Sequence, residues 1–293
     1  MSDLLVSLMD RWIGRRAVAD PRALAAARGL RPVVVVTRAS RGIGRVLAVR
    51  FAQAGRDLLL IARGEPAVEA AALEISKSTS VRVDALALDI TSADSPRLID
   101  QALQANGSYA DVLINNAGVG FAGLFADQSA QDLDRLLALN VTAASRLMRH
   151  VLPPMIARGR GGILNVGSLG GLVPGPYQAA YYASKAYLIS LTEAVAQEAR
   201  GRGVRIAVVA PGPVDTTFHK SMDAEGALYR SVFPAISTNA VAASAYRGFI
   251  MGRTVIVPGL LPTASALALK FLPHALSVPM VAGLLSVKPA RRS

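Results

Sequence analysis

A chain of 293 residues is long enough for one large α/β domain or two small ones, and its hydrophobic fraction of 52% supports a sizeable core. The absence of cysteine excludes disulfide bonds and thiolate metal sites. The three histidines, His150, His219 and His274, lie far apart in sequence without ligand spacing, so no metal site is predicted.

The net charge of +12 is concentrated at the two ends of the chain. Residues 1–50 hold ten arginines against three aspartates, and seven basic but no acidic residues follow Glu225. Cationic ends favour an anionic surface such as phospholipid or nucleic acid, although an arginine-rich soluble protein fits equally well. Because no nucleic-acid-binding module is recognisable, no nucleic-acid partner is predicted.

Residues 1–29 are predicted to form a helical extension. A second short helical pattern, at 21–28, follows a stripe of apolar side chains on one helical face, which consists of Leu4, Leu5, Leu8, Met9, Trp12 and Ile13. The stripe can lie on a membrane surface, pack on the body of the protein or contact a second subunit. The acidic start does not resemble a secretory signal, so a cytoplasmic location is predicted, with membrane association as an alternative.

Between residues 30 and 258, apolar strands are predicted to alternate with helices. The strands are expected at 32–37, 57–62, 81–88, 111–115, 162–167, 204–210 and 254–257. The helices are expected at about 42–54, 67–76, 95–105, 129–155, from before Tyr181 to about 200, and 239–251. Helix-length connections imply parallel strands that are buried on both faces. The predicted fold is therefore α/β, a doubly wound, Rossmann-like parallel sheet of about seven strands with helices on both faces and ligands at the carboxyl ends of the strands.

A glycine-containing loop follows the first predicted strand. Such a loop lets the backbone approach a pyrophosphate, which the next helix binds through its free N–H groups. The loop residues predicted to bind a cofactor are Thr37, Arg38, Ser40, Arg41, Gly42, Ile43 and Gly44. At the end of the second strand, Arg63 stands where an acidic residue would hold the ribose of NAD. Arg41 and Arg63 are predicted to bind the 2′-phosphate of NADP(H), unless both are plain surface arginines.

Three further strand ends complete the predicted cofactor site. Asp89, after the third strand, can accept a hydrogen bond from an adenine amino group. The fourth strand ends in Asn115, Asn116, Ala117 and Gly118. These small residues leave room for the adenosine ribose, and the amides either tie neighbouring strand ends together or act as turn residues. The nicotinamide amide and the phosphates are expected to contact a bend after the sixth strand, formed by Pro211, Gly212, Val214 and Thr216.

Tyr181 and Lys185 stand four residues apart in a predicted helix, and Ser168 precedes the tyrosine by thirteen residues. Residues four apart lie on one helical face, so the phenol and the ammonium are expected to lie side by side. A nearby cation lowers the pKa of a tyrosine towards neutrality, which makes the phenol a usable proton donor or acceptor. Ser168 ends a predicted strand, and its hydroxyl is expected to meet the tyrosine from across the site.

Taken together, these positions resemble the short-chain dehydrogenase/reductase family, of the classical type. The resemblance covers about residues 30–258. The matching pieces occur in the family's order and approximate spacing, and they are the Thr37–Gly44 loop, Asp89, Asn115–Gly118, Asn140, Ser168, Tyr181, Lys185 and Pro211–Thr216.

The resemblance implies a role for each catalytic-type residue. Tyr181 would be the general acid for carbonyl reduction or the base for alcohol oxidation. Lys185 would lower the pKa of Tyr181 and bind the nicotinamide ribose. Ser168 would hold the substrate oxygen, and Asn140 would position a water in the proton relay. Hydride would pass between C4 of the nicotinamide and the substrate carbon.

One departure from the family is serious. Arg38 stands where the family's loop has its first glycine. If that position has a positive φ angle, arginine costs about 1–2 kcal/mol of strain, and its side chain can crowd the adenosine. The alternative function is therefore a catalytically impaired dinucleotide-binding or scaffold protein. A third arginine beside Arg41 and Arg63 can equally add to binding of the 2′-phosphate.

Residues 259–293 form an apolar extension that contains prolines. It lacks the run of about 18 uninterrupted apolar residues expected of a membrane-spanning helix. It is expected to cover the substrate mouth, to dip into a bilayer with the N-terminal stripe, or to pack on the body. The first two roles suit a hydrophobic ketone, aldehyde or secondary alcohol as the substrate. The family resemblance also implies a homo-oligomer, either a dimer or a tetramer.

Overall fold

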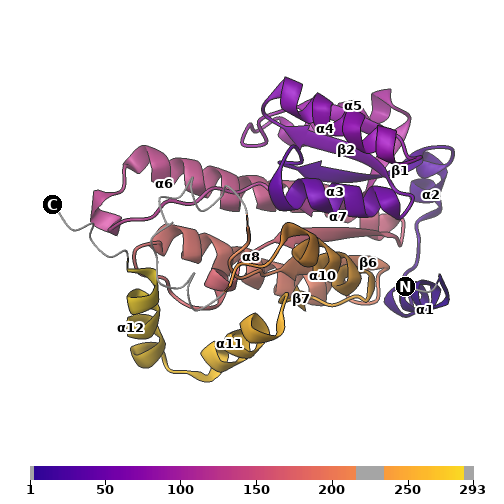
Figure 1. The fold of residues 1–293 in the computed structure, drawn as a ribbon. Helices are drawn as coiled ribbons and strands as arrows, with labels where there is room; N and C mark the ends of the chain where they lie inside the picture. The colour runs from indigo at the N-terminus through magenta and orange to yellow at the C-terminus, as the bar shows by residue number, and fades with distance from the viewer. Residues whose placement is uncertain (1–2, 216–233, 287–293) are drawn as a thin grey trace.

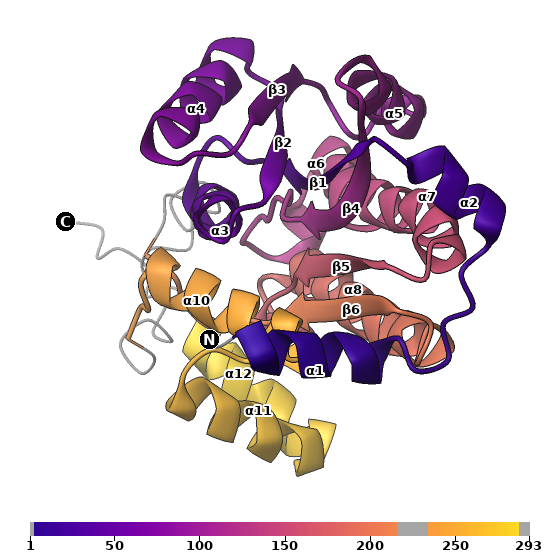
Figure 2. The same ribbon diagram turned by 90° about the vertical axis from the view of Figure 1, so that its right-hand side faces the viewer.

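The chain folds around a parallel sheet of seven strands, which Figures 1 and 2 show from two directions. This computed structural model describes residues 3–215 and 234–286. The strands are β1 Arg31–Thr37, β2 Asp57–Ala62, β3 Val83–Ala87, β4 Ser108–Asn115, β5 Gly161–Val166, β6 Val204–Val209 and β7 Val255–Ile256. Their order across the sheet is β3-β2-β1-β4-β5-β6-β7, so the order reverses between β1 and β4. The predicted doubly wound α/β fold is confirmed.

Helices cover both faces of the sheet, as Figure 2 shows. One face carries α3 Gly42–Gln53, α4 Glu65–Ser78 and α10 Thr238–Ile250. The opposite face carries α5 Ser95–Ala105, α7 Ala144–Ala157 and α8 Ala179–Glu198. The sheet is therefore the middle layer of three, and its carboxyl edge is left for ligands.

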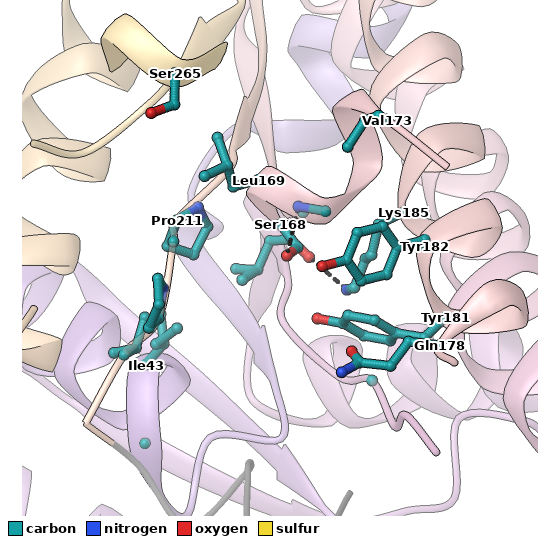
Figure 3. A pocket seen from close by; sticks show the side chains of 18 of the residues that line it. Ile43, Ser168, Leu169, Val173, Gln178, Tyr181, Tyr182, Lys185, Pro211 and Ser265 are labelled. Atoms are coloured by element: carbon teal, nitrogen blue, oxygen red, sulfur yellow. Dashed lines mark hydrogen bonds between the residues drawn. The ribbon is translucent and has the colours of Figure 1, made fainter. Parts of the chain in front are cut away.

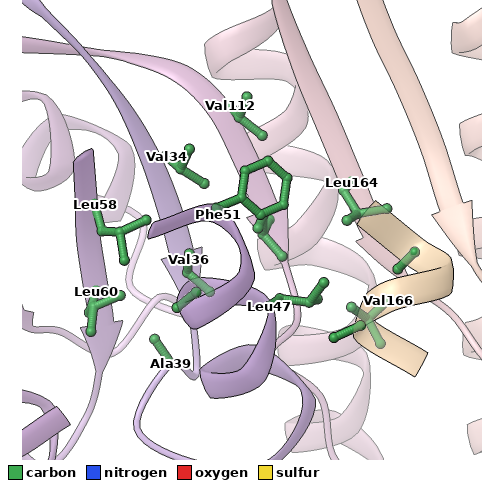
Figure 4. Close-up of a cluster of buried hydrophobic side chains, with 14 of the residues drawn as sticks. Val34, Val36, Ala39, Leu47, Phe51, Leu58, Leu60, Val112, Leu164 and Val166 are labelled. Carbon is green, nitrogen blue, oxygen red and sulfur yellow. The ribbon is translucent and has the colours of Figure 1, made fainter. Parts of the chain in front are cut away.

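The central strand β1 shows how the sequence produces this layering. Val34 and Val36 pack in the layer of α3 and α10, whereas Val33 and Val35 pack in the opposite layer. Successive side chains of a strand point to opposite faces, so a strand covered by helices on both sides is an unbroken apolar run. Figure 4 shows Val34 and Val36 beside Phe51 of α3.

The helical region predicted at 129–155 consists of three segments rather than one helix. α6 Ala130–Leu137 is followed by a π-helical turn, η2 Ala138–Ala143, which leads directly into α7. The buried Asn140 lies within this wider turn and forms two hydrogen bonds with the backbone of Val119. Single π turns of this kind occur frequently at functional sites, and apolar periodicity does not reveal them.

The N-terminal extension contains α1 Asp3–Ile13 and α2 Pro21–Ala27. α1 packs on the body where strands begin: Gly203 N donates to Ile13 O at 3.1 Å, Asp10 pairs with Arg205, and Ile13 is buried. Trp12 in the same helix remains 49% exposed. No helix in residues 3–215 and 234–286 is long and apolar enough to cross a membrane.

Two helices, α11 Leu260–Phe271 and α12 His274–Leu285, follow β7. Val281 and Leu285 of α12 are buried and pack against Val173, which lies before α8. On the same helix, Leu276 is 62% exposed. In Figure 1 α12 lies on the opposite side of the molecule from α1, and α11 lies along the bottom between them.

Candidate active site

A cavity of about 890 Å³ opens at the carboxyl ends of the strands. Its walls come from the loop after β1, the end of β5, α8, the segment after β6, and the helices α11 and α12. Figure 3 shows Tyr181 and Lys185 projecting from α8 towards Ser168, with Ile43 and Pro211 on the other side. The size is typical of small-molecule sites, and the position beside the reversal of strand order is where doubly wound sheets bind ligands.

Thr37 and Asn116 join the ends of β1 and β4 at this cavity. Thr37 Oγ1 donates to Ile114 O at 3.2 Å and accepts from the backbone N–H groups of Asn116 and Ala117 at 2.9 and 3.0 Å. The Asn116 amide Nδ2 donates back to Thr37 O at 3.0 Å and to Arg38 O at 3.2 Å. These bonds agree with the interpretation that the amides tie neighbouring strand ends together.

Asn115, the other amide of this pair, ties the sheet to the layer behind it. Asn115 Nδ2 donates to Asn165 Oδ1 of β5 at 3.1 Å and to Ala144 O of α7 at 3.2 Å. Asn165 in turn donates to Thr192 Oγ1 of α8 at 2.8 Å. This buried chain of bonds connects four elements, β4, β5, α7 and α8, and so helps to fix α8, on which the candidate catalytic residues lie.

The loop between β1 and α3 has the features of a phosphate site. The N-cap residue of α3, Arg41, makes no side-chain capping hydrogen bond, and Gly42 adopts a φ angle of +60°. A Cβ at Gly44 would lie 2.2 Å from Asn116 Nδ2, so the loop packs this closely only with glycine there. An uncapped helix N-terminus beside a cavity lined with cations fits a pyrophosphate. The residues present therefore fit a dinucleotide cofactor.

The predicted cofactor residues divide into two groups. Those that line the cavity are Arg38, Arg41, Gly42, Ile43, Asn116, Gly118, Tyr181, Lys185, Pro211, Gly212 and Val214. Those in the described chain that do not line it are Thr37, Ser40, Gly44, Arg63, Asp89 and Ala117. Thr216 lies outside the described residues. Thr37, Gly44 and Ala117 instead support the loop from within, through the contacts given above.

Arg63 and Asp89 lie together beyond the ends of β2 and β3. Arg63 is exposed, and its positive charge is among the causes that lower the pKa of Asp89. Asp89 Oδ1 accepts from the backbone N–H and the hydroxyl of Thr91, at 3.0 and 2.8 Å. The carboxylate is therefore ionised and fixed in direction, which suits its predicted contact with an adenine amino group.

The three residues expected to meet do so. The Tyr181 hydroxyl is hydrogen-bonded to the Ser168 hydroxyl, and Lys185 Nζ lies 5.8 Å from the centroid of the Tyr181 ring. Lys185 Nζ also donates to Val166 O at 2.9 Å, which fixes the ammonium at the end of β5. Both α8 side chains are buried, at 8% and 5% exposed. The predicted same-face arrangement of phenol and ammonium is present in the structure.

Burial, rather than the ammonium, dominates the acidity of Tyr181. Burial raises the pKa of Tyr181 to about 12, and the hydrogen bond from Ser168 and the charge of Arg38 offset only part of this. The sequence analysis expected Lys185 to lower this pKa towards neutrality, and in this structure the expectation does not hold. The reason is that burial removes the hydration of the phenolate, and the resulting loss of free energy is larger than the stabilisation by Ser168 and Arg38.

Lys185 shifts in the opposite direction for the same reason. Burial, together with the positive charge of Arg38, lowers the pKa of Lys185 to about 8. The ammonium is therefore present below about pH 8 and is lost above that value. Arg38 is thus a cation close enough to act on both members of the pair.

Asn140 is held by backbone rather than presented to the cavity. Its Oδ1 accepts from Val119 N at 2.9 Å, and its Nδ2 donates to Val119 O at 2.8 Å and to Ser184 Oγ at 3.0 Å. Asn140 is not among the cavity-lining residues of the described chain. Its role in positioning a water stays a prediction.

Several cavity residues were not predicted from the sequence. Gln178 is buried at the N-cap of α8, and Tyr182 follows Tyr181 directly. The helices after β7 contribute a further group, consisting of Ser265, Ala268, Leu272, Met280, Val281, Leu284 and Leu285. The spacing of Val281 and Leu285, four residues apart, was the available signal for an inward helical face.

Comparison with known proteins assigns the family. The family model described as short chain dehydrogenase matches residues 32–226. The chain belongs to this family, as the sequence analysis predicted. The family consists of oxidoreductases that bind nicotinamide cofactors.

Among the relatives, the ketoacyl reductase HetN of Nostoc sp. is 35% identical over 184 residues, which cover 63% of this chain and 64% of that protein. The 3-oxoacyl-(acyl-carrier-protein) reductase FabG of Vibrio cholerae is 32% identical over 193 residues, 66% of this chain and 78% of that protein. A solved short-chain dehydrogenase from Sphingobium yanoikuyae in complex with NADPH is 30% identical with a TM-score of 0.71, covering 83% of this chain and 97% of that one. This chain thus spans less than two thirds of the length of HetN.

The structure predicts that the Thr37 hydroxyl is required to keep β1 and β4 together. Thr37→Val keeps the shape but leaves two partly buried N–H groups without their acceptor, and we expect a loss of about 2–4 kcal/mol in the free energy of unfolding. Thr37→Ser, which keeps the hydroxyl, should lose less than half of that. Urea denaturation of the three proteins measures the difference. Equal losses in both variants would show that the methyl group, and not the hydroxyl, stabilises this junction.

Proposed function

We propose that the protein is an NADP(H)-dependent oxidoreductase that transfers hydride between the nicotinamide and a hydrophobic ketone, aldehyde or secondary alcohol. The observation that carries this proposal is the hydrogen-bonded pair of Tyr181 and Ser168, with the Lys185 ammonium beside it, in the wall of a large cavity. The same cavity is bordered by the uncapped N-terminus of α3. A proton donor and a phosphate site therefore share one space.

The proton chemistry follows from the buried hydroxyl pair. A carbonyl oxygen that accepts from both Ser168 and Tyr181 lies at a point where one proton is available. The bound cofactor supplies the hydride to the carbonyl carbon. As the oxygen gains charge, Tyr181 gives up its proton, and the positive charges of Lys185 and Arg38 stabilise the phenolate that remains. Because the pKa of Tyr181 is raised to about 12, the phenol is protonated at neutral pH and ready for reduction.

The preference for NADP(H) is inferred from arginines. Arg41 lines the cavity, and Arg63 stands exposed at the end of β2, where the ribose of a dinucleotide is expected. Guanidinium groups suit the 2′-phosphate of NADP(H), and an acidic residue in their place would suit NAD. The NADPH complex of the Sphingobium yanoikuyae relative supports this assignment.

The hydrophobic substrate is inferred from the helices after β7. The side chains that α11 and α12 contribute to the cavity wall are almost all apolar, and Leu272, Val281 and Leu284 are among them. A polar or charged substrate would lose its hydration here without gaining partners, whereas an acyl or ring substrate would bury apolar surface. The reductases of ketoacyl compounds among the relatives support a substrate of this kind.

The alternative is a dinucleotide-binding or scaffold protein whose catalysis is impaired by Arg38. Arg38 does adopt the left-handed conformation that makes arginine unfavourable, with a φ angle of +50°. Calorimetric titration with NADPH and NADH separates the two functions, because the oxidoreductase must bind one of them. Homo-oligomer formation and contact with a membrane surface stay predictions.

The proposal predicts that Tyr181→Phe abolishes turnover while NADPH still binds. Loss of a general acid costs roughly 100- to 10,000-fold in rate, and we expect kcat/KM for NADPH oxidation by a lipophilic ketone to fall by this factor. The matched control is Tyr187→Phe on the same helix. Tyr187 is 43% exposed, its hydroxyl is hydrogen-bonded to Ser145 Oγ at 3.1 Å, and the variant should retain activity. Turnover by Tyr181→Phe at the parent rate would refute the assignment of the acid.

The proposal also predicts that carbonyl reduction slows as pH rises. The pKa of Lys185 is lowered to about 8, so its ammonium is lost above that pH, while the phenol of Tyr181 stays protonated. We expect kcat/KM for NADPH to be level near pH 7 and to fall with a midpoint near pH 8. Circular dichroism over the same range controls for unfolding. A profile that stays level to pH 10 would contradict a catalytic ammonium at Lys185.

The substrate assignment predicts that the inner face of α12 selects for apolar chain length. Leu284→Ser places a hydroxyl in the cavity wall, and kcat/KM for a long aliphatic ketone should fall about tenfold relative to a short one. Leu276→Ser lies on the same helix but is 62% exposed and should leave the ratio unchanged. Steady-state assays with a homologous series of ketones measure the ratio of kcat/KM for the long ketone to kcat/KM for the short one. An unchanged ratio in Leu284→Ser would place the substrate chain elsewhere.

A further inference from the structure

Arg38 holds a backbone conformation that only its surroundings explain. Its φ angle of +50° lies in the left-handed region, which costs a non-glycine residue about 1–2 kcal/mol. The conformation is imposed from outside, because Arg38 O accepts from Asn116 Nδ2 and the next residue, Ala39, donates to Ile61 O at 3.1 Å. The backbone at this position thus has the conformation typical of glycine in a phosphate-binding loop, but the residue is an arginine.

That side chain crosses the cleft between β1 and β4. Arg38 Nη1 donates to Gly118 O, 80 residues further along the chain, at 2.6 Å. Gly118 itself lies against the catalytic-type residues, since a Cβ added to it would be 3.4 Å from Lys185 Nζ and 3.3 Å from Asn140 Oδ1. The guanidinium is therefore held in the wall of the cavity at Gly118, close enough to Tyr181 for its charge to affect the pKa of that residue.

The positive charges around Arg38 favour the binding of an anion. After burial, the charges of Arg41 and Arg63 are the causes that lower the pKa of Arg38, so it is the inner member of a group of three cations. Lys185 adds a fourth positive charge, and its own pKa is lowered by burial and, as a second cause, by the charge of Arg38. A multiply charged anion that enters this space would relieve the mutual repulsion of these groups.

We propose that Arg38 is a ligand of the pyrophosphate of the bound dinucleotide, and that its bond to Gly118 O holds the guanidinium in position for this contact. The inference rests on the proposed function. It adds a side-chain ligand to the backbone N–H groups with which the loop and the start of α3 are expected to bind the pyrophosphate. A charge-assisted bond from a guanidinium is stronger than one from a peptide N–H, and it offsets the strain at the residue.

The position of Arg38 distinguishes the pyrophosphate from the 2′-phosphate. The 2′-phosphate is expected beyond β2, where Arg63 lies with Asp89. The Arg38 side chain runs the other way, from β1 to the end of β4, which lies on the opposite side of β1 from β2. The pyrophosphate, which doubly wound folds place at the turn after the first strand, is the anion within its reach. NADPH and NADH share this group, so Arg38 should serve both.

The test is isothermal titration calorimetry of NADPH and NADH with four proteins: the parent, Arg38→Gln, Arg38→Lys and Arg63→Gln. We expect Arg38→Gln to weaken both dinucleotides by the same factor, roughly tenfold or more, which corresponds to one hydrogen bond to a charged group. Arg38→Lys should recover most of the affinity because the charge is kept. Arg63→Gln should weaken NADPH and leave NADH unchanged.

Three results would overturn the inference. If Arg38→Gln binds as tightly as the parent or more tightly, Arg38 is neutral or obstructs the cleft. If it weakens NADPH alone, the contact is with the 2′-phosphate. If Arg38→Lys is as weak as Arg38→Gln, charge is not what matters. A parent protein that binds neither dinucleotide would instead refute the proposed function itself.

Arg38→Gly guards against a folding defect in Arg38→Gln, because glycine removes the left-handed strain. It should melt at or above the temperature of the parent in circular dichroism and still lose affinity for both dinucleotides. A glycine variant that gained affinity would overturn the inference and support the impaired alternative.

Discussion

Two side chains, Thr37 and Asn116, hold the end of β1 and the end of β4 together. This junction stabilises the floor of the cleft that opens beyond the two strand ends. Helices leave these two strands towards opposite faces of the sheet, so the chain separates here and a space opens. The Thr37 hydroxyl satisfies two backbone N–H groups that the separation would otherwise leave unpaired. Without that compensation, burying those groups would be costly. The junction also fixes the loop whose residues approach the cofactor.

The acid–base pair illustrates a competition between burial and charge. Burial pushes the pKa of Tyr181 up and that of Lys185 down, so both groups are held in their neutral forms more strongly than in water. A phenol held in this way keeps its proton until charge develops on a nearby oxygen. For the proposed reduction this is useful, because the proton is withheld from solvent and released to the substrate. The cost is a lysine whose charge is lost only slightly above neutral pH.

Much of the fold was predictable because buried parallel strands have a strong sequence signal. β2 was predicted at 57–62 and is found there, because the apolar run at 58–62, between charged residues at 57 and 63, is typical of a buried strand. The short β3 was predicted too long, at 81–88 against Val83–Ala87, because β3 lies at the edge of the sheet and only partly buries its side chains. Boundaries are least certain where burial is incomplete.

The site was predictable in its residues but not in its electrostatics. Spacing alone placed Tyr181 and Lys185 on one helical face, because helix geometry is local. The raised pKa of Tyr181 was missed because it comes from burial of the phenol, which depends on the whole tertiary surroundings and not on the spacing of residues along one helix. The π turn at Asn140 was missed for a related reason, since its stabilising contact is with Val119, 21 residues away.

The part of the chain that matches the family and the part that completes the cavity are different. The match ends at residue 226, whereas α11 and α12, which close the cavity with apolar side chains, lie after residue 259. The matched part contains the candidate proton donor and the phosphate loop, so it is suited to chemistry that many substrates share. For the proposed reaction, selection among substrates would depend on helices whose packing involves inward residues such as Val281 and Leu285. Such a division would let the substrate wall change without disturbing the junction of Thr37 and Asn116, because the hydrogen bonds of that junction join the ends of β1 and β4 and the loops that follow them. Arg38 is the exception, since it alters the shared loop itself, and its effect should therefore appear in cofactor binding rather than in the choice of substrate.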